Sequence, residues 1–115
     1  MNWRVPAWLA VACSATPAFA HAFLNHAEPG AGATMARSPK NVVLKFSEKL
    51  EPAFSGVIVA DQSGRSVEAG SVEIANNCMM APLRPLPPGR YRVFWHVVSV
   101  DTHRTEGAYS FTVKP

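Results

Sequence analysis

The stretch Arg90-Tyr91-Arg92-Val93-Phe94-Trp95-His96-Val97-Val98 decides the fold class, because every second residue in it is large and apolar. Successive side chains of a β-strand point to opposite faces of the sheet. The alternation therefore predicts a strand with one face in a core and Arg92, Phe94 and His96 on the other face. The core face is formed by Tyr91, Val93, Trp95 and Val97.

Shorter strands are predicted on both sides of this stretch, with Pro and Gly between them about every ten residues. The last one turns Tyr109, Phe111 and Val113 inward, and a helical turn is expected only near 48–52. The predicted strands are 41–47, 55–60, 65–69, 71–74, 78–83, 90–98 and 108–113. About seven short strands with Pro/Gly corners predict an all-β, immunoglobulin-like β-sandwich of two sheets.

The first twenty residues have the three parts of a secretory signal peptide. One arginine near the start is followed by the apolar run 5–12 and by Ala18-Phe19-Ala20, a small-x-small cleavage signal. The run is too short to span a bilayer, which takes ~20 residues. Cleavage after Ala20 would leave residues 21–115 as one small domain that begins at His21. A rival cut remains open, because residues 10–13 faintly resemble a lipoprotein signal, and lipidation at Cys13 would keep His21 internal.

Charge and cysteine content exclude some classes of protein. The formal net charge is +3 and the basic residues are scattered along the chain, so no basic run indicates nucleic-acid binding. Cys78 is the only cysteine after residue 20, so the processed chain has no intrachain disulfide. The run Cys78-Met79-Met80 offers soft ligands that suit Cu(I), but we expect these side chains to belong to the core.

Two places in the sequence carry ligand chemistry. As a new N-terminus, His21 would offer its α-amine, whose pKa is about 8, and its imidazole Nδ1 to one metal ion. Directly after the long strand, Asp101-Thr102-His103 places a carboxylate and an imidazole two residues apart, so that both point the same way. Three nitrogens and one oxygen form a tetragonal set that suits one Cu(II) ion, with Ni(II) second. Zinc prefers a tetrahedral set and calcium prefers oxygen ligands.

At this point the sequence resembles the CopC-type periplasmic copper-resistance proteins. The matching elements are His21-x-x-Leu24 with Pro29 and Gly32, Phe46-Ser47-Glu48, Leu86-Pro87-Pro88-Gly89-Arg90-Tyr91-Arg92-Val93-x-Trp95, and Val97-Val98-Ser99-x-Asp101-x-His103 with Gly107. The resemblance implies a seven-stranded Greek-key sandwich or barrel. It also implies a Cu(II) site of His21, Asp101 and His103, in which Glu48 is an outer ligand or hydrogen-bond acceptor.

The same resemblance implies a periplasmic location and a role in copper homeostasis and resistance. The protein would buffer Cu(II) or carry it to a CopD-like membrane partner, and we expect it to be a monomer and not an enzyme. Two departures matter. Residues 61–77 contain no methionine where some members have a Met-rich Cu(I) segment, which disfavours a second site, and Arg104 stands where the family often has proline.

Two other functions remain as alternatives. An oxidative enzyme with a copper held by an N-terminal histidine, like the lytic polysaccharide monooxygenases, would need an open copper position that Asp101 would occupy. A metal-free, immunoglobulin-like interaction domain would make His21 incidental. Nucleophile–base pairs of hydrolases and phosphate-binding glycine loops are not visible in the sequence.

Overall fold

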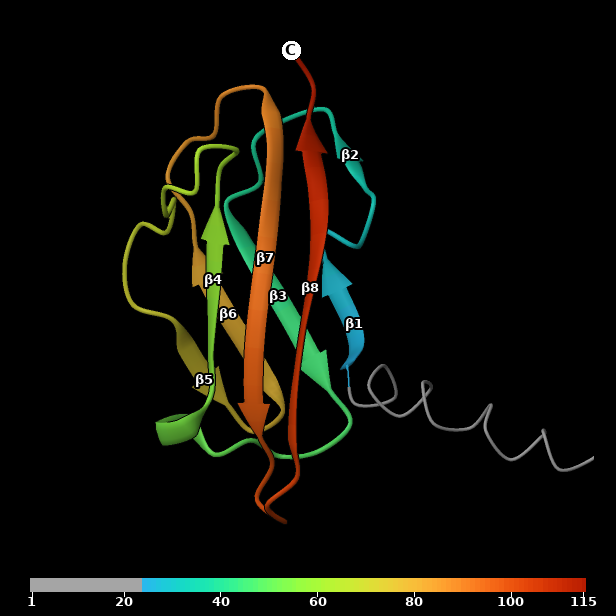
Figure 1. The fold of residues 1–115 in the computed structure, drawn as a ribbon, viewed down its shortest axis with the longest axis vertical. Helices are drawn as coiled ribbons and strands as arrows, with labels where there is room; N and C mark the ends of the chain where they lie inside the picture. Colours follow the sequence, from blue (N-terminus) through green and yellow to red (C-terminus); the bar gives the residue numbers. More distant parts are fainter. Residues whose placement is uncertain (1–23) are drawn as a thin grey trace, which may run out of the picture.

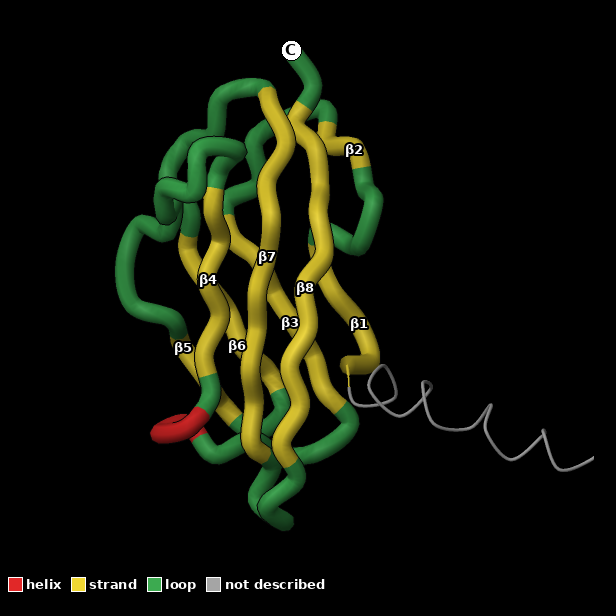
Figure 2. Tube along the Cα trace, viewed as in Figure 1, coloured by secondary structure: helices red, strands yellow, loops and turns green. Residues whose placement is uncertain are grey.

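The computed structural model describes residues 24–115, and these form a sandwich of two four-stranded sheets (Figures 1 and 2). The first sheet has the order β1 (Leu24–Glu28), β3 (Asn41–Phe46), β6 (Cys78–Pro82), β5 (Glu73–Ala75). The second has the order β2 (Thr34–Met35), β8 (Arg104–Val113), β7 (Gly89–Val98), β4 (Gly56–Ala60). The predicted all-β sandwich of two sheets is confirmed. The described residues form eight strands, because the seven predicted ranges leave out β1 and β2 and include 65–69, which is not one of the eight.

The strand that decides the fold class lies in the centre of the second sheet and has the predicted faces. Its core face is buried, whereas Arg92, Phe94 and His96 are exposed. Across the sandwich it meets β3 and β6, which contribute Val42, Leu44, Phe46, Met79 and Ala81. The rings of Phe46 and Trp95 pack edge to face, with centroids 5.3 Å apart. This aromatic contact joins the two sheets in the half of the sandwich where β3 and β7 end.

Three details of the predicted strands are wrong. β8 begins at Arg104 rather than at 108, because its first inward positions hold Thr105 and Gly107, which lack the large apolar side chains that mark a strand. Residues 65–69 form only isolated bridges to β4 and to Leu83, since the Glu68 carboxylate, and not a backbone carbonyl, accepts the Val59 N–H. Only Met79 of the Cys78-Met79-Met80 run is in the core. Cys78 is half-buried and points the other way, so its predicted place in the core is wrong.

One end of the sandwich is formed by the loops that follow β3 and β7. The Glu51 N–H donates to the Val98 carbonyl over 2.8 Å, and the Val100 N–H donates to the Lys49 carbonyl over 3.0 Å. Leu24 pairs with Phe46, the last residue of β3, so the described chain begins near the same end (Figure 1). We call this the loop end; it comprises residues 47–55 and 99–103. None of the described residues belongs to a helix long and apolar enough to cross a membrane.

Candidate metal centre

The turn 99–103 connects β7 directly to β8 and brings two potential ligands together. The Thr102 N–H donates to the Ser99 carbonyl over 2.8 Å, and the Ser99 N–H donates to the His103 carbonyl over 2.9 Å. Thr102 has a left-handed backbone with φ of 70°, which reverses the chain between its two neighbours. As a result Asp101 Oδ1 lies 3.2 Å from His103 Nδ1. The two side chains converge, as the i, i+2 spacing predicts.

Ser99 holds this turn in place from inside the sandwich. Its side chain is completely buried, and its hydroxyl donates to Asp101 Oδ1 and accepts the His103 N–H over 3.2 Å. The Ser99 hydrogen bond holds the pKa of the Asp101 carboxyl below its usual range, and the neighbouring His103 lowers it further. Sequence reasoning missed this residue. The alternation along β7 could have indicated it. Ser99 follows Trp95 and Val97 at every second position, so it is a polar side chain on the buried face.

The Asp101–His103 pair is accessible from solvent. The side chains are 48% and 76% exposed, respectively, so a metal ion can reach both without any rearrangement of the core. A pair at this exposure stabilises the fold very little by itself, because water screens it. The pairing of these two side chains in the turn is therefore better explained by ligand binding than by stability, and Cu(II) accepts both an imidazole nitrogen and a carboxylate oxygen.

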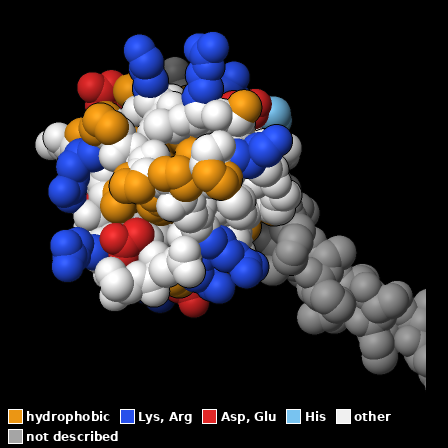
Figure 3. All heavy atoms as spheres, turned by 90° about the horizontal axis from the view of Figure 1, so that it is seen from above, with side chains coloured by type: hydrophobic (Ala, Val, Ile, Leu, Met, Phe, Trp, Pro, Cys, Tyr) orange, Lys and Arg blue, Asp and Glu red, His pale blue; other side chains and the backbone are white. Residues whose placement is uncertain are grey.

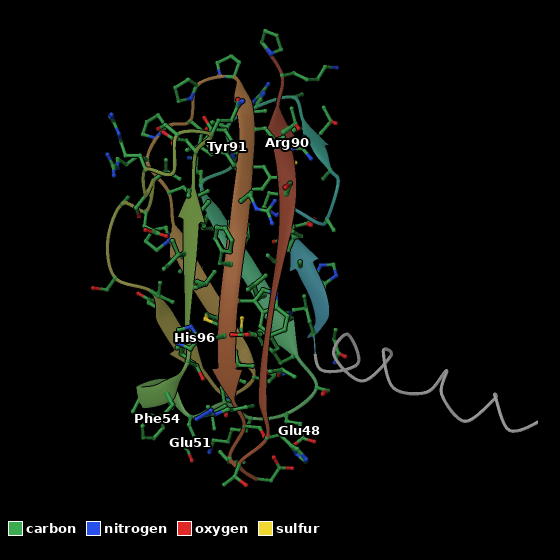
Figure 4. The ribbon with its side chains drawn as sticks, in the orientation of Figure 1. Glu48, Glu51, Phe54, Arg90, Tyr91 and His96 are labelled. Atoms are coloured by element: carbon green, nitrogen blue, oxygen red, sulfur yellow. The ribbon has the colours of Figure 1, made fainter. Side chains whose placement is uncertain are left out.

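Within residues 24–115, the other sequence candidates make no hydrogen bond or ion pair with Asp101 or His103. Glu48 is half-buried in the loop end, next to Lys49, whose carbonyl binds the 99–103 turn, but its carboxylate has no hydrogen bond to Asp101 or His103 in the described part of the chain (Figure 4). His26 is exposed on β1, opposite Lys45. His96 is exposed on the outer face of β7, opposite Glu106.

Residues 24–115 contain no group of three or more His, Cys, Asp or Glu side chains placed to hold a metal ion. The turn supplies two donors, and a four-donor site would need further ligands from elsewhere. His21 and the predicted signal peptide, residues 1–20 with Cys13, lie outside the described residues. In the sequence, His21 stands three positions before Leu24, the first described residue.

Replacing Ser99 with alanine should loosen the ligand pair while leaving both ligands present. We expect Ser99→Ala to weaken Cu(II) binding about 10- to 100-fold, the usual effect of losing a group that orients a ligand. It should also raise the pKa of Asp101, which can be followed by NMR of the Asp101 carboxyl carbon. The pKa of Asp101 is lower in the folded protein than in the unfolded chain, so the ionised carboxylate stabilises the fold. This stabilisation is fully present above the unfolded pKa of about 3.9 and is lost as the pH falls through the folded value.

Ser63→Ala is the matched control for this prediction. The Ser63 hydroxyl donates to Asp61 Oδ1 and lowers the pKa of that carboxyl in the same way, but in the turn after β4. It should raise the pKa of Asp61 and leave that of Asp101 and copper binding unchanged. Equal copper affinity in Ser99→Ala and the unmodified protein would show that Ser99 does not position the ligands.

Fold and turn together define a class: small two-sheet β-sandwich domains with an Asp-x-His turn at one end. The family model for the CopC domain matches residues 24–114, almost all of the described chain. The protein therefore belongs to the CopC family.

Individual relatives agree with this assignment. Protein YobA of Escherichia coli K12 is 40% identical over 100 residues, which cover 84% of this chain and 81% of that protein. Copper resistance protein C of Xanthomonas campestris pv. juglandis is 33% identical over 115 residues, which cover 92% of this chain and 90% of that protein. The crystal structure of CopC from Methylosinus trichosporium OB3b superposes with a TM-score of 0.74 at 35% identity, covering 81% of this chain and 93% of that one.

One relative is much longer than this chain. The copper transport protein CutJ of Bacillus subtilis is 30% identical over 99 residues, which cover 83% of this chain but only 18% of CutJ. A domain of this kind is therefore also found as a minor part of a larger protein named for copper transport.

Proposed function

We propose that this protein binds one Cu(II) ion through His21, Asp101 and His103 and acts in copper homeostasis and resistance in the periplasm. The observation that carries the proposal is the Asp101–His103 pair, 3.2 Å apart at the end of the sandwich where the described chain of this CopC family member begins. The processed chain of the proposal is residues 21–115, after cleavage of the signal peptide 1–20.

Chain reach and amine chemistry support the N-terminal half of the proposed site. Residues 21–23 can extend at most about 10 Å from Leu24. Leu24 pairs with Phe46, and the loop after Phe46 is bonded to the turn that bears the ligands. At neutral pH a metal readily displaces the proton of an α-amine with a pKa of about 8. The amine and imidazole of His21 with Asp101 and His103 then give the three-nitrogen, one-oxygen set that Cu(II) favours.

Glu48 has a supporting role in this proposal. It lies in the loop whose Lys49 carbonyl binds the Val100 N–H, one residue before Asp101. From this position its carboxylate would accept a hydrogen bond from a ligand of the completed site or act as an outer ligand. Groups that orient a metal ligand in this way fix its geometry and raise its basicity.

The proposed activity is binding and transfer rather than catalysis. Asp101 would take the copper position that an oxidative enzyme must leave open for oxygen. Copper resistance protein C and CutJ carry the names of copper-resistance and copper-transport proteins. We infer that the protein is a monomer that buffers copper or carries it to a CopD-like membrane partner. The match to part of the longer copper transport protein supports such a link to transport.

A Cu(II) titration of the processed protein, with a competing chelator, tests the proposed function. We expect binding to saturate at one ion, with an axial electron paramagnetic resonance spectrum that shows nitrogen hyperfine coupling. No binding at micromolar concentrations would favour the metal-free interaction domain. Peroxide-driven oxidation of chitin or cellulose by the copper-loaded protein would favour the oxidative enzyme.

A further inference from the structure

The fold gathers basic side chains that are scattered along the sequence. At the end of the sandwich opposite the loop end, the Lys114 N–H donates to the Met35 carbonyl, the Leu83 N–H to the Lys40 carbonyl and the Arg90 N–H to the Gln62 side chain. These bonds bring the segments 35–40, 61–66, 83–90 and 112–115 together. We call this the basic end. Its cations are Arg37, Lys40, Arg65, Arg84, Arg90 and Lys114.

The cations of the basic end outnumber the acids around them. Arg65 is near enough to Asp61 to lower the pKa of that carboxyl. All six side chains are exposed, and they are six of the 11 Lys and Arg in the chain, whereas only two of its eight Asp and Glu, Asp61 and Glu68, lie nearby. Asp61 accepts hydrogen bonds from Ser63 and Arg65 N–H groups, and Glu68 accepts from Val59 N–H and the Ser66 hydroxyl. Within residues 24–115, none of the six cations has a carboxylate oxygen within 4.0 Å.

The centre of the basic end is apolar and rigid. Pro85, Pro87 and Pro88 are exposed there, and Leu86 anchors them from below, with its N–H bound to the Ser38 hydroxyl over 2.7 Å. The Tyr91 hydroxyl donates to the Pro87 carbonyl and fixes the segment further. Figure 3 shows this end with apolar side chains in the middle and Lys and Arg around them. Such a surface is formed before any partner binds, so little ordering is needed on contact.

The loop end has the opposite charge balance. Its residues, 47–55 and 99–103, include the acids Glu48, Glu51 and Asp101 against the single cation Lys49. The charges are therefore separated along the strands. β7 connects the two ends and has ten residues, which corresponds to a separation of about 30 Å.

We propose that the basic end docks reversibly on an anionic phospholipid bilayer. The six cations surround an apolar surface and do not converge on one point, which matches an extended layer of phosphate groups better than a single bound anion. Each Lys or Arg near such a layer strengthens the binding, and the attraction weakens with salt. In this orientation the Asp101–His103 turn points away from the bilayer and stays open to copper. The docking does not depend on the proposed copper function.

Vesicle co-sedimentation of the metal-free processed protein tests this proposal. We expect binding to vesicles with about 30% phosphatidylglycerol at about 20 mM salt, loss of binding at about 500 mM salt, and none to pure phosphatidylcholine. The triple variant Arg37→Gln, Lys40→Gln, Lys114→Gln should bind anionic vesicles at least about tenfold more weakly, since it loses three of the six cations.

The matched control removes the same number of positive charges from another part of the surface. Lys45→Gln, Lys49→Gln, Arg104→Gln neutralises three exposed cations away from the basic end, and it should keep most of the vesicle binding. Circular dichroism must show that both variants are folded. Equal loss in the two variants, or absence of binding at low salt, would overturn the proposal. So would capture of poly-glutamate, but not of anionic vesicles, through the basic end, because the surface would then serve an acidic protein.

Discussion

His103→Ala should weaken Cu(II) binding by more than about a hundredfold, because loss of a group that only orients a ligand already costs about 10- to 100-fold. Among the described histidines, His103 is the one with a carboxylate oxygen within 4.0 Å of its ring nitrogen, namely Asp101 Oδ1 at 3.2 Å. Competition with a chelator of known affinity measures the effect. Asp101→Asn, which keeps the size of the side chain and removes its charge, should act in the same direction.

His26→Ala and His96→Ala are the controls for this prediction. Both side chains are exposed, one on β1 and one on the outer face of β7, and neither is in the 99–103 turn. Copper affinity in these two variants should equal that of the unmodified protein. If either control weakened binding as much as His103→Ala, the copper ion would have to lie on the face of a sheet and not at the loop end.

Gly107→Ala should destabilise the fold by about 3 kcal/mol, since over-packing of a tight core commonly costs 1–3 kcal/mol and rigid neighbours raise the cost. Gly107 pairs with Trp95, and a Cβ at this position would lie 2.6 Å from Cζ2 of the Trp95 ring. The ring cannot move away easily, because its other side packs against Phe46. Urea unfolding followed by fluorescence measures the effect, and Trp95 is the only tryptophan after residue 20.

Gly70→Ala is the matched control for the over-packing prediction. A Cβ at Gly70 would meet only Pro82 Cγ at 3.9 Å, an ordinary contact, so the free energy of unfolding should hardly change. Trp95→Phe in the Gly107→Ala background should recover part of the loss, because the smaller ring leaves room for the new methyl group. Its unfolding is followed by circular dichroism, since this variant lacks the tryptophan. A Gly107→Ala protein as stable as the original would contradict the described packing of Trp95.

The sequence predicts the parts of the fold in which apolar alternation is strong. β7 has the predicted faces because its core positions hold four large apolar side chains. The start of β8 could not be predicted in the same way, since Thr105 and Gly107 take inward positions without an apolar signal. Residues 65–69 have a strand-like composition, but the Glu68 carboxylate replaces the backbone partner that a ladder needs.

The candidate site, too, could be predicted only in part from the sequence. The spacing of Asp101 and His103 predicts that they converge, because i and i+2 share a direction. The role of Ser99 depends on where β7 ends and on how the turn closes, which spacing alone does not give. The basic end could not be predicted from the sequence for a different reason. Its cations come from four segments far apart in the sequence, and only the pairing of the strands brings these segments together.

The central claim is that the copper site is completed by the N-terminus created when cleavage follows Ala20. Cu(II) affinity should be compared between the protein that begins at His21, verified by intact mass, and the same protein with one extra alanine ahead of His21. The extra residue keeps the imidazole but moves the α-amine out of its chelate ring. We expect a loss of more than about a hundredfold in affinity together with a changed paramagnetic spectrum. Equal affinity and an unchanged spectrum would contradict it.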